Sequence, residues 1–281
     1  MKVTASQAGE MAIPAFTLSN GVEMPVLGLG TFPMNNREVK SAIESAHEIG
    51  YTLFDTSSAY GNERGVGSSL SGGDFVTTKI SNKAQRGGGV REELVKSMVK
   101  LRRRKIDLLL LHWPYPDKYA ESWKMLERFY RKGFCRAIGV ANFHEHHLRE
   151  LMRDAEIAPM VNQVELHPML SQKPLIEFCK SQGILVEAYS PFARMDERLF
   201  GSDILARISD KHGKSKTQII LRWNYQNDVV SIPKTSSAER MKENASIFDF
   251  SLSDADMAAI DSIDSGTRVR HDPDHCDFDR L

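Results

Sequence analysis

Short apolar or β-branched runs recur along the chain at nearly even intervals. Their starts lie about 29 residues apart, close to the length that one β-α-β unit requires. Eight such runs are present, at Val26–Gly30, Thr52–Asp55, Phe75–Lys79, Asp107–His112, Ala137–Ala141, Met160–Val164, Ile184–Tyr189 and Val229–Ile232. Amphipathic stretches with helical spacing separate them, among them Arg37–Ile49, Arg91–Leu101, Ser122–Lys132, Glu145–Asp154, Lys173–Gln182 and Lys216–Gln226. This alternation predicts an α/β fold, an eight-stranded parallel (β/α)8 TIM barrel.

An open, doubly wound sheet would show the same alternation of strands and helices. The first strand-to-helix turn argues against that fold. Gly28-Leu-Gly30 is followed by Thr31-Phe-Pro33, so the G-x-G-x-x-G fingerprint of dinucleotide-binding sheets is not completed. The sequence therefore favours the barrel.

The segments at the two ends of the chain add to the barrel pattern. Asn20-Gly21 lies between apolar-rich flanks in Phe16–Met24, which predicts a β-hairpin that closes the bottom of the barrel. Residues 1–12 hold no apolar core segment and are expected to form a flexible tail. Residues 266–281 are expected to form a second tail over the active site. No linker rich in Pro, Gly or Ser divides the chain, so residues 1–281 are predicted to form a single domain.

The composition excludes several classes of protein. Lys and Arg together number 37, as do Asp and Glu, so the net charge does not support binding to nucleic acid or to an anionic membrane. Three widely spaced cysteines without a C-x-x-C pair predict neither a disulfide framework nor a zinc site. No apolar run approaches the ~20 residues of a membrane span. We therefore expect a cytoplasmic protein, and the neutral surface favours a monomer.

Two local clusters suggest other functions at first sight. The histidines His144, His146 and His147 are too close in sequence for the i, i+4 spacing of helical metal ligands, so an exposed first helical turn and no metal site are predicted. The basic run Arg102–Lys105 falls at a predicted helix C-terminus, where cations complement the helix dipole. Without aromatic residues among the basic ones, this run predicts no nucleic-acid partner.

Polar residues stand where the apolar strands stop, and a β/α barrel forms its active site at these carboxyl ends. Every strand from the second onward ends in this way. A single polar strand end can be explained by exposure to solvent, but a polar residue at every one of these strand ends is hard to explain by exposure alone. In chain order the polar residues are Asp55, Lys79, His112, Asn142, Gln163 with Glu165, Tyr189 with Ser190, and Lys234. The sequence therefore predicts one polar site at this end of the barrel.

These residues lie in motifs that resemble those of the aldo-keto reductase family. Phe54–Glu63 is similar to the family stretch D-T-A-x-x-Y-x-N-E. The other motifs follow in the family's order, at Thr77–Lys79, Leu111–Pro114, Ile138–Phe143, Asn162–Glu165, Ala188–Pro191 and Ile232–Lys234. The short loop after His112 is most similar to the small microbial and protist members, of the diketogluconate reductase and prostaglandin F synthase types. The resemblance covers nearly the whole chain and implies reduction of aldehydes or ketones to alcohols with NADPH/NADP+.

Four of the strand-end and loop residues have the chemistry that carbonyl reduction requires. Tyr60 is the candidate proton donor, although an unperturbed phenol has a pKa of about 10 and is a weak acid at neutral pH. The ammonium of Lys79 is expected to lower that pKa, and Asp55 to hold Lys79 in place. His112, as a neutral imidazole, would hydrogen-bond the carbonyl oxygen. The resemblance implies the same catalytic roles for these four positions.

The nicotinamide half of the cofactor is expected to lie beside these residues. Tyr189 can stack on a flat ring, and the side chains of Asn142, Gln163 and Glu165 can hydrogen-bond a carboxamide. Ala141 stands where the family usually has Ser, so one expected hydrogen bond to the cofactor is missing. The resemblance implies further cofactor contacts at Gly30, Thr31, Phe32, Asp55, Ser190, Pro191 and Phe192.

The last strand leads into a helix start that carries cations. Helix N-termini have free N–H groups and partial positive charge, so they bind phosphate. The order I-P-K-T-S-S-x-x-R-x-x-x-N resembles the family's adenosine-phosphate site, which implies that Lys234 and Arg240 bind a 2′-phosphate. NADPH is therefore expected to be preferred over NADH. The residues implied in this half of the cofactor site are Lys234, Thr235, Ser236, Arg240, Glu243 and Asn244.

A small carbonyl substrate is expected to bind among Phe32, Tyr60, His112 and Trp113, with Phe192 beside them. The residues do not specify the compound; diketogluconate, prostaglandin endoperoxide, methylglyoxal, lipid aldehydes and quinones all remain open. A second class of function also remains open, a barrel that binds NADPH as a regulatory or redox-sensing subunit with little turnover. A hydrolase or isomerase is disfavoured because the strand ends carry no paired carboxylates.

Overall fold

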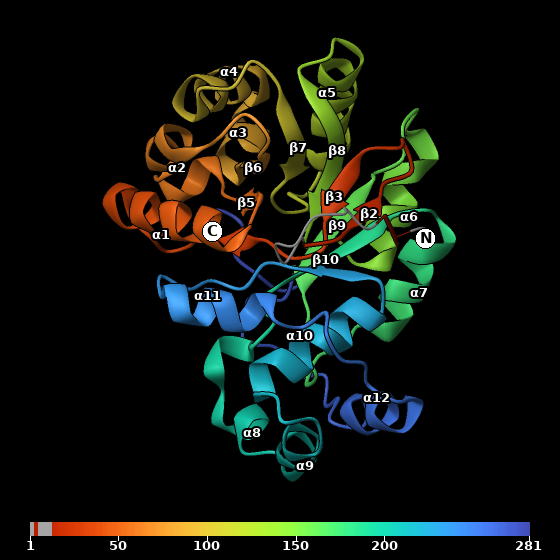
Figure 1. Cartoon of the computed structure of the whole chain (residues 1–281). Coiled ribbons are helices and arrows are strands. Elements are labelled where there is room, and N and C mark those ends of the chain that lie inside the picture. Colours follow the sequence, from red (N-terminus) through yellow and green to blue (C-terminus); the bar gives the residue numbers. More distant parts are fainter. Residues whose placement is uncertain (1–2, 5–12) are drawn as a thin grey trace.

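Eight parallel strands form the central layer of the computed structural model, which describes residues 3–4 and 13–281 (Figure 1). The strands are β4 (Leu29–Gly30), β5 (Leu53–Asp55), β6 (Phe75–Ile80), β7 (Ile106–Leu111), β8 (Cys135–Ala141), β9 (Val161–Glu165), β10 (Leu185–Tyr189) and β11 (Val229–Ser231), and each pairs with the next. Leu27 forms a parallel bridge to Ser231, and the Gly28 N–H donates to the Ser231 carbonyl at 2.9 Å. The first and last strands therefore meet, and the predicted barrel is confirmed.

Helices connect the strands and cover the outside of the sheet (Figure 1). The described residues form α1 (Asn36–Ile49), α2 (Glu63–Ser69), α3 (Asn82–Gly87), α4 (Val90–Leu101), α5 (Tyr119–Arg131), α6 (Glu145–Asp154), α7 (Lys173–Ser181), α8 (Glu197–Phe200), α9 (Asp203–His212), α10 (Lys216–Gln226), α11 (Ala238–Ala245) and α12 (Asp254–Asp261). Local signals set their ends. Asn35 and Glu38 form a capping box before α1, and Gly50 ends this helix at φ 99°, where glycine is favoured.

An antiparallel hairpin of β2 (Ala15–Thr17) and β3 (Glu23–Pro25) lies at the amino ends of the barrel strands. Asn20 in its turn donates to the Arg136 carbonyl at 2.9 Å, near the start of β8, and the buried Phe16 ring stacks on Tyr225. The predicted hairpin at the barrel bottom is therefore confirmed. Val3–Thr4 form the short strand β1 beside β2, where a tail was expected. The rest of the predicted tail, residues 1–2 and 5–12, lies outside the described residues.

The barrel strands are buried on both faces, as expected of a parallel sheet covered by helices. All six residues of β6 and all six of β7 are buried. Gly139 allows close strand packing, because a Cβ there would lie 2.5 Å from the Val161 carbonyl oxygen. Since the strands run parallel, their carboxyl ends all lie at one end of the barrel, which is where the predicted polar residues stand.

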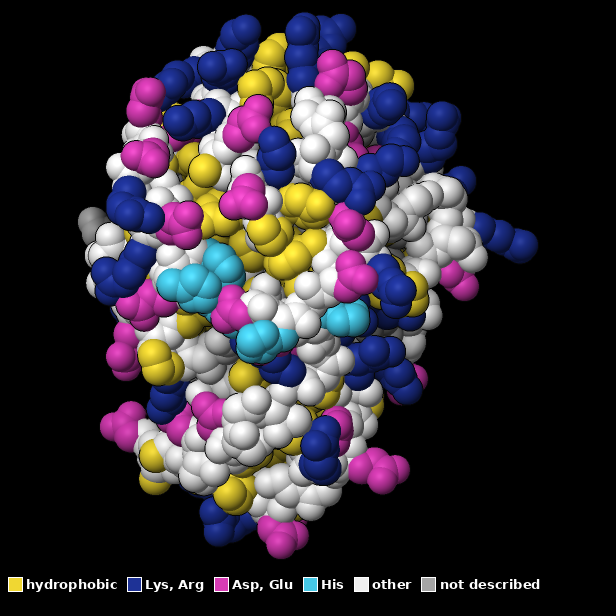
Figure 2. Space-filling model, turned by 180° about the vertical axis from the view of Figure 1, so that it is seen from behind, with side chains coloured by type: hydrophobic (Ala, Val, Ile, Leu, Met, Phe, Trp, Pro, Cys, Tyr) yellow, Lys and Arg dark blue, Asp and Glu magenta, His cyan; other side chains and the backbone are white. Residues whose placement is uncertain are grey.

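The surface agrees with the neutral net charge. Figure 2 shows basic and acidic side chains interspersed over one face, with smaller areas of apolar side chains between them. Among residues 3–4 and 13–281, no helix combines the length and the apolar character needed to span a membrane.

Candidate active site

The topology brings the four predicted catalytic residues to the carboxyl end of the barrel. Asp55 is the last residue of β5, Lys79 is the last but one of β6, and His112 directly follows β7. These strands are neighbours in the sheet, so their ends lie side by side. Tyr60 closes a short 3-10 helix, Ser58–Tyr60, in the loop between β5 and α2. We refer to the four residues as the tetrad.

Lys79 is the centre of the tetrad and is completely buried. Its Nζ donates to the two oxygens of Asp55 at 2.7 and 2.6 Å and to the Thr56 carbonyl at 2.9 Å. Burial is the largest single effect and opposes the charge of the ammonium, but the Asp55 carboxylate, together with Tyr60 and Glu187, acts in the opposite direction, and the net result is a raised pKa of Lys79. The side chain is therefore a fixed cation, 3.5 Å from the Tyr60 hydroxyl.

The pKa of Tyr60 differs from the sequence-based prediction. Burial raises it above the ordinary value of a phenol, and this effect outweighs the ammonium of Lys79, which acts in the lowering direction. The Asp55 carboxylate adds to the rise. The expected net decrease was wrong because the sequence does not show how deeply the hydroxyl is placed. Tyr60 is thus fully protonated at neutral pH, with a cation ready to stabilise its phenolate.

His112 is a neutral imidazole, as predicted. Burial lowers its pKa to about 3, and the positive charges of Lys79 and Arg270 act in the same direction. Its Nδ1 lies 3.3 Å from the Ser57 hydroxyl. If that hydroxyl donates, the ring proton is on Nε2 and can be donated to a carbonyl oxygen. The His112 and Tyr60 rings lie edge to face with their centroids 5.7 Å apart, so both side chains can hydrogen-bond to the same carbonyl oxygen.

Two predicted nicotinamide contacts, Asn142 and Tyr189, are bonded to each other and to the tetrad region. The Tyr189 hydroxyl donates to Asn142 Oδ1 at 2.7 Å, and Asn142 Nδ2 donates to the His112 carbonyl at 2.9 Å. Asn142 has a φ of 64°, in the left-handed region that Asn tolerates better than most residues. Ala141 before it is completely buried. These bonds fix the Tyr189 ring at the end of β10.

Gln163 connects the tetrad to a second buried carboxylate. Its Nε2 donates to Asp55 Oδ2 at 2.8 Å and to Glu187 Oε2 at 2.6 Å. The amide N–H groups are therefore used inside the protein, and only the amide oxygen is left to meet a carboxamide. Burial raises the pKa of Glu187 to about 8, with Asp55 adding to the effect.

The first strand contributes backbone and one aromatic ring to this end of the barrel. The Thr31 hydroxyl donates to the Asp55 carbonyl at 2.8 Å and is completely buried. A Cβ at Gly30 would lie 2.7 Å from the Ile232 carbonyl oxygen, so only glycine fits there. Phe32 is 48% exposed, and its ring lies 5.0 Å from that of Tyr60. The half-buried Phe192 and the buried Pro191 follow the half-buried Ser190 after β10.

The predicted phosphate site lies at the start of α11. Ser237 caps this helix, and its Oγ accepts from the Arg240 backbone N–H. Lys234, Ser236 and Arg240 are exposed, whereas Thr235 and Asn244 are buried. The carboxylate of Glu243 accepts hydrogen bonds from Ser215 and Thr217 at the start of α10, so it faces that helix.

The end residue of β9, Glu165, is committed to the C-terminal tail. Its Oε1 accepts from the Val269 N–H at 2.6 Å and from the His167 ring, and its Oε2 accepts from the Arg270 N–H at 3.1 Å. Both carboxylate oxygens of Glu165 are thus used inside the protein, a role that the sequence does not show because it does not reveal which segment returns to a strand end.

The tail, residues 266–281, lies beside the predicted substrate-binding residue Trp113. This indole is buried and contacts the rings of His271 and Phe278, with centroids 6.5 and 6.4 Å away. Asn82 donates to the Phe278 carbonyl at 3.0 Å, which fixes the last turn of the tail to α3. The tail and the tetrad thus share one end of the barrel.

Comparisons with known proteins show the family to which this chain belongs. Residues 26–265 match the family model described as the aldo/keto reductase family. The chain belongs to this family. It is 46% identical over 268 residues to the glyoxal reductase of Bacillus subtilis, covering 93% of this chain and 96% of that protein. The 9,11-endoperoxide prostaglandin H2 reductase of Trypanosoma cruzi is 40% identical over 267 residues, with 92% and 94% covered.

Solved structures of aldo-keto reductases share the fold. The crystal structure of a Bombyx mori aldo-keto reductase in complex with NADP superposes with a TM-score of 0.85 at 32% sequence identity, covering 94% of this chain and 96% of that one. An aldo-keto reductase from a deep-sea metagenome library gives a TM-score of 0.89 at 37% identity, with 94% and 100% covered.

Two residues of this aldo-keto reductase site were missed in the sequence. Ser57 lies beside His112, in the position of the alanine of the family motif D-T-A-x-x-Y-x-N-E. Glu187 lies behind Gln163, and a charged residue inside the apolar run Ile184–Tyr189 was the available signal. In a strand buried on both faces, an acidic side chain requires a polar partner inside the barrel.

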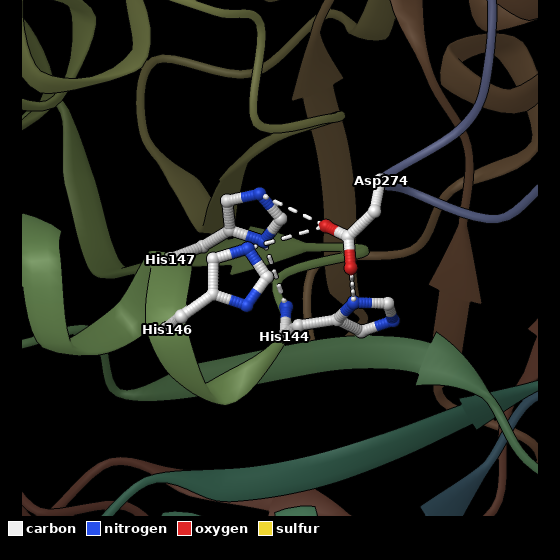
Figure 3. Close-up of side chains that lie close together, drawn as sticks. All are labelled: His144, His146, His147 and Asp274. Atoms are coloured by element: carbon white, nitrogen blue, oxygen red, sulfur yellow. Dashed lines mark hydrogen bonds and ion pairs between the residues drawn. The ribbon is translucent and has the colours of Figure 1, made fainter.

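The histidines at the start of α6 lie close together with a carboxylate from the tail (Figure 3). His144 Nδ1 lies 2.8 Å from Asp274 Oδ2, while the Nε2 atoms of His146 and His147 lie 3.2 and 3.4 Å from Oδ1. The predicted exposed turn was wrong for two of the three, because the side chains of His144 and His147 are only 19% and 13% exposed. Asp274, distant in sequence, covers them.

In two of the histidines, the ring nitrogen that points away from Asp274 accepts a hydrogen bond, which indicates where the ring proton lies. His144 Nε2 accepts from the Arg268 guanidinium at 2.7 Å, and His147 Nδ1 accepts from the His144 backbone N–H at 3.1 Å. In neutral rings the protons are then on the inner nitrogens, which face Asp274. Metal-bound histidines have the reverse arrangement, with the N–H pointing outward. The cluster is therefore a histidine clamp, made of His144, His146 and His147, that holds Asp274 and the tail.

Proposed function

We propose that this protein is an NADPH-dependent reductase that converts aldehydes or ketones to alcohols, with Tyr60 as the proton donor. The observation that carries the proposal is the buried Lys79 ammonium, held by Asp55 on one side and 3.5 Å from the Tyr60 hydroxyl on the other. The neutral His112 stands next to Tyr60. The similarity to a glyoxal reductase supports a carbonyl substrate.

Each residue of the tetrad has a separate role in one proton transfer. When bound, NADPH would supply the hydride for the carbonyl carbon. His112 donates a hydrogen bond from Nε2 to the carbonyl oxygen and fixes its orientation. Tyr60 gives its proton to that oxygen as negative charge develops there, and Lys79 stabilises the phenolate that remains. Asp55 keeps the ammonium charged and in place.

The residues at the carboxyl end fit a dinucleotide with a 2′-phosphate. Lys234 and Arg240 are exposed at the start of α11, and neither forms an ion pair within residues 13–281. We assign them to the phosphate, with Thr235, Ser236 and Asn244 beside them and Glu243 fixing α11 to α10. The nicotinamide half is assigned to Asp55, Asn142, Gln163, Tyr189, Ser190, Pro191 and Phe192, with Gly30, Thr31 and Phe32 next to it.

A small carbonyl compound would bind among Phe32, Tyr60, His112 and Trp113. The chain would act as one catalytic domain, and we expect a monomer in the cytoplasm with no nucleic-acid or membrane partner. The competing function, a regulatory subunit that binds NADPH with little turnover, has no support in the tetrad, since all four catalytic groups are present and in contact.

The test is the NADPH absorbance of a mixture of protein, NADPH and 4-nitrobenzaldehyde. The proposal predicts steady loss of absorbance, with a much higher kcat/KM for NADPH than for NADH. Tight NADPH binding without turnover of any aldehyde in a panel would favour the regulatory function. Comparable kcat/KM values for the two cofactors would contradict the assignment of Lys234 and Arg240.

A further inference from the structure

The tail carries three arginines, and they differ in their partners. Arg268 bonds His144 and lies 3.7 Å from Asp272, and Arg280 lies 3.2 Å from Asp277. The guanidinium of Arg270 forms neither an ion pair nor a side-chain hydrogen bond within residues 13–281, although its backbone N–H is bonded to Glu165. A guanidinium has five N–H donors in a planar fork that suits carboxylate or phosphate. All five N–H donors of the Arg270 guanidinium are therefore available to a ligand.

This free guanidinium faces the active site. Its Cζ lies 5.8 Å from the centre of the Phe32 ring, and that ring is 5.0 Å from the ring of Tyr60. The contact with Phe32 is a cation–π interaction, which holds the arginine over the exposed aromatic ring at the site. The charge of Arg270 also acts on the tetrad, since it lowers the pKa of His112 together with burial and Lys79.

The backbone on both sides of Arg270 is anchored. Glu165, buried at the end of β9, holds the N–H groups of Val269 and Arg270. Four residues later the histidine clamp holds Asp274 (Figure 3). A side chain presented from a backbone fixed in this way loses less conformational freedom when it binds a ligand.

We propose that Arg270 determines specificity by binding the carboxylate of an anionic carbonyl substrate, an aldehyde acid or a keto acid. This proposal rests on the function proposed above. The substrate's carbonyl group would meet Tyr60 and His112 while its carboxylate meets the guanidinium at Phe32. A neutral aldehyde would bind without this ion pair. The cofactor also carries anionic groups, its phosphates, and the test separates the two sources of negative charge.

The experiment compares two para-substituted benzaldehydes of similar shape, the anionic 4-carboxybenzaldehyde and the neutral 4-nitrobenzaldehyde. In Arg270→Gln we expect kcat/KM for the carboxylate to fall about tenfold or more, mainly through KM, since a charge-assisted hydrogen bond is lost. Values for 4-nitrobenzaldehyde and the KM for NADPH should stay unchanged. Arg270→Lys, which keeps the charge, should retain part of the preference. Arg280→Gln, which removes a charge from the same tail, should behave like the wild type.

Equal losses for both aldehydes, or a raised KM for NADPH with both, would overturn the proposal and assign Arg270 to the cofactor or to tail structure. Wild-type enzyme that reduces neither aldehyde would contradict the proposed function instead. Calorimetric titration of 4-(hydroxymethyl)benzoate, the product of reduction, decides the question in that case. Binding that is lost in Arg270→Gln and kept in Arg280→Gln supports the carboxylate site, and binding that is equal in all three proteins, or absent, rejects it.

Discussion

The protonation state of each side chain in the tetrad depends on its neighbours. Lys79 is a completely buried cation, and a lone ammonium in such a place would lose its proton. Asp55 prevents this with two hydrogen bonds from the ammonium, and Thr56 accepts a third. The same pair then serves Tyr60, whose phenolate would otherwise form in a place without compensating charge. Stability and catalysis thus depend on the same buried ion pair.

Removing one member of this pair separates the two roles. In Lys79→Met the Asp55 carboxylate is buried without its cation, so the free energy of unfolding is expected to fall by about 3–5 kcal/mol. In the double variant Asp55→Asn/Lys79→Met no charge is left unpaired, and most of that loss should be recovered, while reduction stays absent. Urea unfolding at neutral pH measures the first quantity and NADPH consumption the second. A double variant as unstable as the single one would contradict a charge-based explanation.

The protonation states of His112 and Tyr60 predict a level pH profile. His112 has a pKa of about 3 and stays neutral, and the raised pKa of Tyr60 keeps its proton on the hydroxyl. The kcat for aldehyde reduction should therefore change little from roughly pH 5 to pH 7, a range that includes the ordinary pKa of histidine and lies below the pKa of Glu187. A step in kcat near the ordinary histidine value would show that His112 is protonated during turnover.

At the scale of elements, much of the fold could be predicted from the sequence. Strands such as Asp107–His112 were visible because a parallel strand buried on both faces is a continuous apolar run. The strand-end positions of Asp55, Lys79 and His112 followed from that register. The direction of the Tyr60 pKa, the use of Glu165 by the tail and the meeting of Asp274 with the histidines were not visible. Each of these depends on burial or on segments that are distant in sequence.

Glu187 in β10 makes stability depend on pH. Its folded pKa of about 8 lies above the ordinary 4.5, so between these values the unfolded chain loses a proton that the folded protein keeps. Its contribution to stability is therefore complete below the ordinary pKa and is lost as the pH rises toward about 8. Glu187→Gln should be increasingly more stable than the wild type over this range, by at most about 1.4 kcal/mol per pH unit. Thermal unfolding at several pH values measures the difference, and a difference independent of pH would contradict the raised pKa.

The histidine clamp joins the tail to α6, so its loss should affect the tail alone. Asp274→Ala removes the carboxylate that lies within 3.4 Å of all three histidines and is hydrogen-bonded to His144. We expect faster hydrogen exchange in residues 266–281 with unchanged exchange in the barrel strands. Asp277→Ala is the matched control, since it removes the exposed contact with Arg280 and a hydrogen bond from the Asp279 N–H but leaves the histidines and Asp274 intact. Equal protection of the tail in Asp274→Ala and the wild type would show that Glu165 and Trp113 hold it without the clamp.

The whole molecule is neutral but its charges are unevenly placed at the active-site end. Lys79, Lys234, Arg240 and Arg270 all belong to that end of the barrel, while the face shown in Figure 2 mixes both signs. The fold makes this possible because eight parallel strands deliver their carboxyl ends to one place. A neutral chain can therefore bind a small polyanionic cofactor without attracting polyanions in general.

The central claim is that this barrel transfers a proton from Tyr60 to a carbonyl oxygen while NADPH is consumed. The most direct test is the rate of NADPH consumption with 4-nitrobenzaldehyde in the wild type and in Tyr60→Phe, with the Kd of NADPH measured in both proteins. The account predicts turnover by the wild type, a loss of at least about a hundredfold in kcat for Tyr60→Phe, and the same Kd. Full activity in Tyr60→Phe would contradict it.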